Sequence, residues 1–336
     1  DSEANTTKHN NVITKEYLDY IGGMEAALPG AVNNISYTHA VTINLLAKGQ
    51  DSVVKFRTSA AANPMATAFG GNVYWQELPE SDDFILSLYD LIGEGSRMPT
   101  SKNEVVLVVD EYNRINKSFF EQLGITDETE QFKLTDFIGK TILKVIPNDS
   151  FYTQNGDLFA AANPSDYEAL YNGDTGTALT IVGILRANPD AASTYLSSGI
   201  AYTTALTNAV VADAQNSAIA KAQSESDKNV LLGTPFADAG EKDKALLALG
   251  ADTTPTGVNI YPKDYASKDQ IKTYLDGYNA GRPDDQQLIY SDMAELITSI
   301  TGTLLDTVTY VLVGFAAISL LVSTIMIAII TYVSVI

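Results

Sequence analysis

The sequence predicts an α+β protein that ends in one long helix. Two observations support this fold class. The last thirty residues, 307–336, contain no charged side chain. The chain before them carries helix-period and strand-period patterns close to its beginning and again close to its end. We therefore expect a mixed body over residues 1–290, joined to a terminal helix.

The terminal segment reads TVTYVLVGFAAISLLVSTIMIAIITYVSVI. About eighteen apolar residues without charge suffice to cross the hydrocarbon core of a bilayer, and thirty residues would give about 45 Å of helix. The alternative is the buried central helix of a soluble domain, but such helices rarely exceed about twenty residues. The pattern therefore favours a transmembrane helix over residues 307–336.

Residues 291–306 carry one apolar stripe on an otherwise polar helix. Ser291 is the expected N-cap, and Gly302 is the one weak point before the apolar segment. We predict a continuous helix, in which a stalk becomes the transmembrane segment. A narrow stripe requires a partner helix, which we expect from chain upstream of Asp1. The stripe consists of Met293, Ile297, Ile300, Leu304, Val308 and Val311.

Composition excludes several function classes. The net charge of −20 is carried wholly before Thr307, which argues against a nucleic-acid partner and against docking on anionic lipid heads. An acidic body fits the outer side of a cell membrane, because cytoplasmic flanks are rich in Lys and Arg. The absence of cysteine excludes disulfides and thiolate chemistry. The first residues do not resemble an export signal, so we expect a further membrane helix upstream.

Residues 1–94 predict a helix, a hairpin and a second short helix. The first helix is expected from Thr14, its N-cap, to Leu28, just before Pro29 and Gly30. Alternating β-branched and polar residues at 34–49 and 52–59, on the two sides of a turn at 48–51, predict two strands that form a hairpin. The second helix is expected at 83–92.

Residues 95–255 predict mainly short strands with polar turns. The strands are expected at 105–109, 140–146 and 178–185, with a helix from Lys117 to Gly124 between the first two. Residues 199–229 are rich in alanine and predict one helix. Residues 213–255 contain little that could build a core, which predicts a surface excursion.

Residues 256–290 predict a compact β-α-β unit. A strand at 258–265 precedes a helix at 267–279, whose expected capping box is Ser267 with Gln270. A second strand is expected at 286–292. This order of elements is similar to the α-β-β order near the start of the chain. We therefore expect the two ends to pack together as one split α+β layer, with residues 95–255 inserted between its two parts.

The terminal helix also resembles a known family. Leu321–Met326 and Val333–Val335 are similar to the second transmembrane helix of the FtsX/MacB family of ABC transporter permeases. The body is similar to extracellular domains of Gram-positive members of that family. The segments that carry this second likeness are GSRMPTSKNEVVL, LTIVGILR, GIAYTTALT and KDYASKDQIKTYLDGYN.

This resemblance implies both an architecture and partners. A porter-like α/β subdomain is split over residues 1–94 and 256–290, and a mostly-β, sabre-like subdomain occupies 95–255. The stalk follows at 291–306 and the transmembrane helix at 307–336. The implied partners are a second permease copy as a homodimer, a cytosolic ABC ATPase subunit and an extracellular adaptor protein. ATP hydrolysis is expected on a separate subunit or domain, and the stalk would transmit the nucleotide-driven motion outward.

The sequence offers no catalytic, cofactor or metal site. His9 lies in the polar lead, and His39 lies in an expected strand without an identifiable acid or hydroxyl partner. Glu80, Asp82 and Asp83, or Asp284 and Asp285, could bind calcium, but both groups lack the spacing of a calcium loop, so solvated loops are favoured. No zinc-protease, hydrolase or nucleotide-binding motif occurs.

Three further features each allow a structural interpretation. Trp75 could be an exposed anchor for a ligand or partner, but sealing a seam between subdomains is favoured. The 18 tyrosines could line a ligand groove, yet at such spacings they more often form half-buried core edges. The N-x-[ST] triplets at Asn5, Asn34 and Asn116 arise often by chance and are given no weight.

Two hypotheses of function remain. The first is the outer domain and membrane helix of an ABC exporter permease, which acts as a mechanical transducer. The second is a membrane-anchored extracellular domain for sensing or adhesion. They differ in the chain expected beyond Ile336. A charged segment and further membrane helices would favour the permease. A short basic tail or a signalling domain would favour the anchored domain. An enzyme ranks third, because no acid, base and nucleophile converge.

Overall fold

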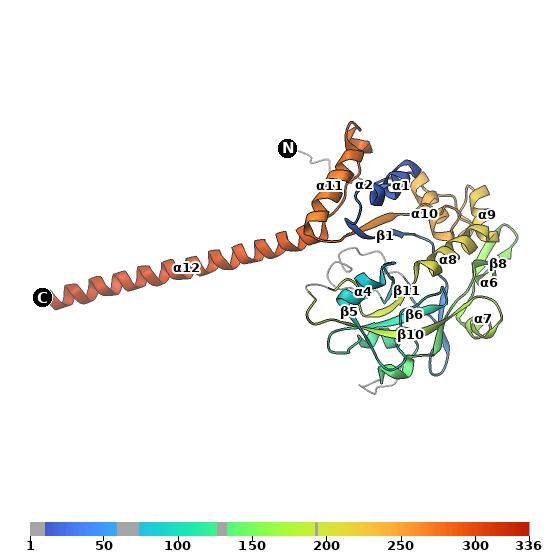
Figure 1. Ribbon diagram of the computed structural model, residues 1–336, viewed down its shortest axis with the longest axis horizontal. Coiled ribbons are helices and arrows are strands. Elements are labelled where there is room, and N and C mark those ends of the chain that lie inside the picture. The colour runs from blue at the N-terminus through green and yellow to red at the C-terminus, as the bar shows by residue number, and fades with distance from the viewer. Residues whose placement is uncertain (1–10, 59–73, 126–132, 192–193, 336) are drawn as a thin grey trace. The chain divides into compact units, whose positions relative to one another are not determined.

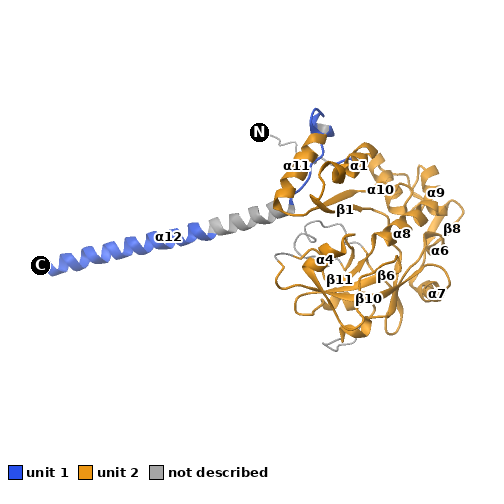
Figure 2. Cartoon of the chain, viewed as in Figure 1, with its two compact units in different colours: residues 1–12, 279–336 blue, residues 13–278 orange. Residues whose placement is uncertain are grey.

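The computed structural model describes residues 11–58, 74–125, 133–191 and 194–335, apart from the side chains of 285 and 293–307 (Figure 1). It is a mixed α and β protein, as the sequence predicts. The chain divides into two units, residues 13–278 and the remainder (Figure 2). We describe each unit by itself, beginning with the larger.

Over its described residues, the larger unit contains short helices around twelve strands. The helices are α1 (Lys15–Gly22), α2 (Met24–Ala27), α4 (Asp82–Leu88), α5 (Lys117–Gln122), α6 (Asn148–Phe151), α7 (Tyr167–Asn172), α8 (Thr204–Asn216), α9 (Ala218–Glu225), α10 (Ala239–Leu249) and α11 (Tyr265–Asn279), with the 3₁₀ turns η1 (Leu134–Phe137) and η2 (Pro164–Asp166). The strands are β1 (Val32–Thr38), β2 (Leu45–Lys48), β3 (Val53–Lys55), β4 (Trp75–Glu77), β5 (Tyr89–Ile92), β6 (Glu104–Val109), β7 (Thr141–Val145), β8 (Tyr152–Asn155), β9 (Leu158–Ala161), β10 (Thr177–Ala187), β11 (Gly199–Tyr202) and β12 (Gly257–Pro262).

Eight of these strands form one sheet. Its order is β3-β2-β7-β10-β6-β11-β4, and β5 pairs with the second half of β10. The pairs β10–β6 and β11–β4 are parallel and the others are antiparallel. The sheet takes strands from both sides of residue 94, where the sequence places a subdomain boundary.

Strand β6 lies at the centre of the sheet and is buried on both faces. Val105, Leu107 and Val109 belong to one core cluster, which includes side chains of α5 and α8. Val106 and Val108 belong to the cluster on the other face, together with side chains of α4. Its continuous apolar run, which predicts a strand at 105–109, is the pattern expected of a strand covered on both sides.

Strand β10 contains a bulge at Gly183, which changes which of its side chains face each core cluster. Leu179 and Ile181 face the first cluster, and after the register shift Ile184 faces it again. The extra residue therefore corrects the alternation of side chains. A Cβ on Gly183 would lie 2.3 Å from the Arg97 carbonyl oxygen, so only glycine allows this approach.

The two ends of the larger unit pair with each other, as the sequence predicts. Strand β1 pairs antiparallel with β12 as a separate two-stranded sheet. The tyrosines of α1 and α11 interlock beside it. The Tyr20 hydroxyl donates to the Tyr274 carbonyl, the Tyr274 hydroxyl donates to the Tyr20 carbonyl, and the two rings stack 4.4 Å apart.

Several predicted elements are confirmed with small shifts. Thr14 caps α1 through its Oγ, which accepts from the Tyr17 N–H. The predicted hairpin exists between β2 and β3. The predicted helix at 117 ends just before Gly124, which adopts a φ of 72°. Strands β7 and β10 lie where they are expected, at 140–146 and 178–185.

Other predictions are wrong. Residues 34–49 do not form one strand, because β1 and β2 belong to different sheets. The expected helix at 83–92 ends at Leu88, and β5 follows at once. The expected helix at 199–229 begins as β11, and Ser217 then separates α8 from α9. Apolar β11 is buried in the sheet, a tertiary contact that outweighs its local helix preference.

Residues 213–255 are also not an excursion without a core. Leu249, Val230 and Ile219 form a buried cluster with Phe159 of β9. The high proportion of alanine and polar residues hides these few large side chains. Helix α11 begins two residues earlier than predicted, and its cap is Asp264, whose Oδ1 accepts from the Ser267 N–H, instead of Ser267 with Gln270.

The smaller unit consists mainly of α12, an uninterrupted helix of 43 residues at Met293–Val335. This confirms the predicted continuity of stalk and apolar segment, although the helix begins two residues after Ser291. The described backbone at 286–292 does not form the predicted strand. The 3₁₀ turn η3 (Asp284–Gln286) and irregular chain occupy the region. The Asn279 side chain holds Leu288 through two hydrogen bonds of 2.8 Å.

Replacing Gly183 by alanine should destabilise the body by about 1–3 kcal/mol, because the new methyl group would overlap the Arg97 carbonyl oxygen. Chemical unfolding can be followed by the fluorescence of Trp75, the one tryptophan of the chain. Gly22→Ala is the control, since its Cβ would meet nothing within 4 Å. That variant should gain about 0.5–1 kcal/mol. Equal stability of the two variants would contradict the role of the bulge.

Glu104 should make stability depend on acid. Hydrogen bonds from Arg97 and from the Thr100 backbone lower the pKa of Glu104 to about 2. The folded state therefore resists protonation, and its advantage is present above the ordinary pKa of about 4.3 and lost as the pH falls toward 2. Glu104→Gln should flatten the loss of stability between about pH 4.5 and 2.5. Glu94→Gln, at an exposed glutamate, controls for the loss of one charge. If the free energy of unfolding falls with pH equally steeply in both variants, Glu104 is not the group responsible.

Candidate functional site

Helix α12 is long and apolar enough to cross a membrane. Over Val308–Val335 its mean hydropathy reaches 2.5 in the most apolar stretch, and none of that stretch is buried inside the protein. A central helix of a soluble domain would be covered by other elements. The exposure of large side chains such as Phe315, Leu320 and Ile327 therefore favours a membrane anchor.

Three hydroxyl side chains in this segment make hydrogen bonds within the helix. Ser323, Thr324 and Thr331 each donate to the carbonyl four residues earlier, at 2.8 Å in each case. In hydrocarbon no water replaces a missing partner, so these internal bonds lower the cost of burying a hydroxyl in lipid. The segment therefore presents few unsatisfied polar groups to a bilayer.

Two tyrosines mark both ends of the apolar segment. Tyr310 and Tyr332 are exposed on α12, and the helix rise places them about 33 Å apart along its axis. This spacing is close to the thickness of a hydrocarbon core, about 30 Å, and tyrosine is enriched where lipid meets water. The two residues therefore fit the two interfaces of one bilayer.

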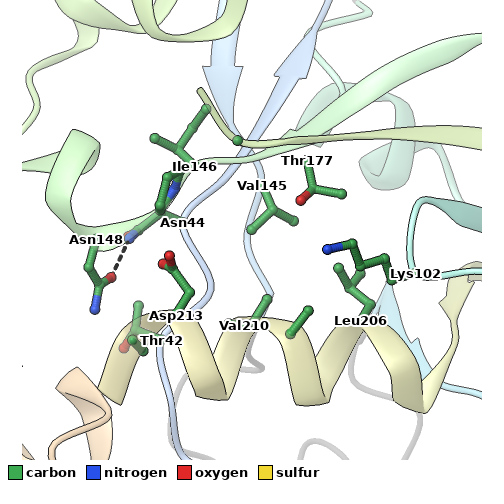
Figure 3. Close-up of a pocket in the computed structure, with 14 residues that line it drawn as sticks. Thr42, Asn44, Lys102, Val145, Ile146, Asn148, Thr177, Leu206, Val210 and Asp213 are labelled. Carbon is green, nitrogen blue, oxygen red and sulfur yellow. Dashed lines mark hydrogen bonds between the residues drawn. The ribbon is translucent and has the colours of Figure 1, made fainter. Parts of the chain in front are cut away.

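The larger unit contains a second candidate site, a cavity of about 240 Å³. It lies at the end of the large sheet where β2 and β10 begin and β7 ends, and α8 forms one wall (Figure 3). Apolar side chains line the middle of the cavity and polar ones its ends. The lining residues discussed below are Thr42, Asn44, Lys102, Val145, Ile146, Asn148, Thr177, Leu206, Ala209, Val210 and Asp213.

A pair of buried asparagines lies at one end of the cavity. The Asn44 Nδ2 donates to the Asn148 Oδ1 at 3.0 Å. The Asn148 Nδ2 in turn lies 3.4 Å from the Ser217 Oγ and 3.3 Å from the Leu249 carbonyl oxygen. The Asn44 Oδ1 is buried and accepts no hydrogen bond from any described residue. This oxygen is thus unpaired and enclosed, on a side chain that is only 2% exposed.

Charged groups of opposite sign reach the cavity from its two ends. Figure 3 shows the Asp213 carboxylate beside the asparagines and the Lys102 ammonium near Thr177 and Leu206. Desolvation raises the pKa of Asp213, and Asp149 raises it further, while a hydrogen bond from the Asn148 backbone acts in the opposite direction. Both side chains are exposed, so the cavity has an acidic end at Asp213 and a basic end at Lys102, each in contact with solvent.

The residues singled out in the sequence are not brought together by the fold. Trp75 is buried in the main core, where it stacks on Tyr202 at 4.4 Å, so it is not an exposed anchor. His39 follows β1 instead of lying within a strand, and its Nδ1 has no partner among the described residues. Glu80 lies in a bend before α4, whose first turn contains Asp82 and Asp83. His9 and Asn5 lie outside the described residues.

The remaining candidates have local roles. Asn34 is buried in β1, and the side chain of Asn116 caps α5. Asp284 belongs to η3. Half of the tyrosines are half-buried, as in the pair formed by Tyr20 and Tyr274. Within the described ranges no three His, Cys, Asp or Glu side chains are placed to hold a metal ion.

The comparisons with known proteins add no relative. No family model, no curated protein and no solved structure matches this chain. The geometry therefore defines only a class: a mixed α and β body with one C-terminal helix able to anchor it in a membrane.

An arginine at the middle of α12 should weaken membrane insertion. Leu321 lies midway between Tyr310 and Tyr332, where a cationic side chain costs about 2.5–3.5 kcal/mol. We expect Leu321→Arg to increase the fraction of the chain released from membranes by alkaline carbonate. Val335→Arg, near the helix end, should remain bound because its charge can reach the interface. Equal release of both variants would contradict a membrane-spanning α12.

Proposed function

We propose that this chain is the outer domain and second membrane helix of an ABC exporter permease of the FtsX/MacB type, and that it transmits motion across the membrane. The observation that supports this proposal is the continuity of α12 over 43 residues. The helix contains no proline, so each backbone N–H beyond the first turn can donate within the helix. A rod of this length spans about 65 Å, about twice the hydrocarbon thickness.

The rod has two parts with different chemistry. Its last 28 residues are apolar and exposed, which suits lipid. Its first fifteen or so residues alternate apolar and polar side chains with helical spacing, which suits contact with one neighbouring helix in water. A simple tether needs no ordered segment of this kind outside the bilayer. A helix that transmits displacement does, because a flexible linker would absorb the movement.

The proposal implies a set of partners. A second copy of the chain would complete a permease homodimer, a cytosolic ABC ATPase subunit would drive the motion, and an extracellular adaptor protein could receive it. The acidic body would lie outside the cell, consistent with the charge distribution. The competing function is a membrane-anchored domain for sensing or adhesion, in which α12 only retains the body at the surface.

The absence of cysteine allows a direct test. A single cysteine introduced at Tyr265, which is 76% exposed on α11, can carry a spin label without background from native thiols. The labelled chain is purified from its native membranes and reconstituted with the associated proteins. We expect a copurifying ATPase, and a distance between the labels of two copies that changes with ATP and vanadate. The anchored domain would instead be supported if no ATPase copurifies and if the distance between labels does not change with nucleotide or only one labelled copy is present.

Proline at position 300 should uncouple the two ends of the rod. Ile300→Pro would remove a helical hydrogen bond and kink the helix, at a cost of about 3 kcal/mol or more. We expect ATP hydrolysis to persist while the nucleotide-dependent change in label distance is lost. Ile300→Ala keeps the helix and should preserve the change. A full distance change in Ile300→Pro would refute mechanical transmission through α12.

A further inference from the structure

The cavity beside α8 has charged groups of opposite sign at its two ends, a carboxylate and an ammonium, and apolar walls between them. Lys102 makes no salt bridge with any described residue, and neither does Asp213. The two charges therefore do not neutralise each other across the cavity.

We propose that this cavity binds a small elongated zwitterion, in which a short apolar segment separates an ammonium from a carboxylate. The ammonium would meet the Asp213 carboxylate, and the ligand carboxylate would meet Lys102. This assignment concerns the larger unit alone and holds whether or not the chain belongs to a transporter.

The position of the charges selects an elongated ligand over a compact one. Lys102 lies near Leu206 (Figure 3), and Asp213 follows Leu206 by seven residues on the same helix, which is about 10 Å along the axis. An α-amino acid carries its ammonium and carboxylate on one carbon and could reach only one end. A dipeptide or an ω-amino acid separates the two groups and can reach both.

The walls of the cavity select an apolar middle segment. Val145 and Ile146 lie on the sheet side, and Leu206 and Val210 lie on the helix side. The volume of about 240 Å³ corresponds to roughly eight water molecules at about 30 Å³ each. A molecule with a similar number of non-hydrogen atoms fits, whereas drug-sized ligands require larger pockets.

The electrostatics of the asparagine end favour a cation. Asp213 is joined there by Asp149, which raises the pKa of Asp213 by repulsion. The side-chain amide of Asn148 is already used on Asn44, Ser217 and Leu249, so it does not supply a donor to Asp213. A ligand ammonium would relieve the repulsion between the two carboxylates.

The test uses the intact chain in lipid nanodiscs and isothermal titration calorimetry. The probes are ε-aminocaproate, its isomer leucine, and the single-charge analogues caproate and hexylamine. We expect ε-aminocaproate to bind at least about tenfold more tightly than leucine or either analogue, because only it makes charge-assisted bonds at both ends. The dipeptide Ala-Ala distinguishes the two ligand classes. If it binds more tightly than ε-aminocaproate, the ligand is a peptide, and if it binds more weakly, the ligand is an ω-amino acid.

Variants locate the binding in this cavity. Asp213→Asn should weaken the binding of ε-aminocaproate and of hexylamine by about tenfold and leave the binding of caproate unchanged. Lys102→Gln should weaken the binding of caproate and leave that of hexylamine unchanged. Ala209→Phe should fill the cavity and abolish binding, whereas Ala212→Phe, an exposed position on the same helix, should not. Failure of ε-aminocaproate and Ala-Ala to bind, equal affinity for leucine, or equal behaviour of the two phenylalanine variants would overturn the proposal.

Discussion

The structure of the body depends on the burial of β6 and β10 on both faces. A strand whose successive side chains are all apolar cannot leave either face in water without a large loss of hydrophobic free energy. Both faces must therefore be covered, and α4 covers one while α5 and α8 cover the other. The bulge at Gly183 keeps the long strand β10 consistent with both clusters. The cavity lies beside α8 at one end of this sheet, and Leu206 and Val210 contribute both to the core cluster and to the cavity lining.

The sequence predicts best those elements whose pattern is strong over a short distance. The apolar run of β6, the Thr14 cap and the charge-free terminal helix each carry an unambiguous local signal. The errors fall where tertiary contacts outweigh local preference. Gly199–Tyr202 continues into an alanine-rich segment that favours a helix, but it joins the sheet between β6 and β4. Leu249 and Ile219 are single large residues in polar surroundings, and their common cluster arises only when α9 and α10 pack.

The two candidate sites differ in how far sequence can define them. The membrane-spanning character of α12 is a property of contiguous residues, so it can be read without coordinates. The cavity draws on residues from 42 to 214, and its charges come from a loop before β6 and from the last turn of α8. Neither Lys102 nor Asp213 belongs to a motif. The one local signal is Asn44, a polar residue at the start of an apolar strand, and only its buried, unpaired oxygen gives it meaning.

The two proposals constrain each other through linkage, although they rest on different parts of the chain. If the body changes shape when the helix transmits motion, a ligand in the cavity binds one shape more tightly than the other. Such a difference must act in both directions, because coupling between binding free energies is reciprocal. A ligand that stabilises the contact between α8 and the sheet would then alter the nucleotide affinity of the ATPase. If ligand affinity is independent of nucleotide, the cavity lies on a rigid part of the body, and motion of α12 would then leave the central sheet undeformed.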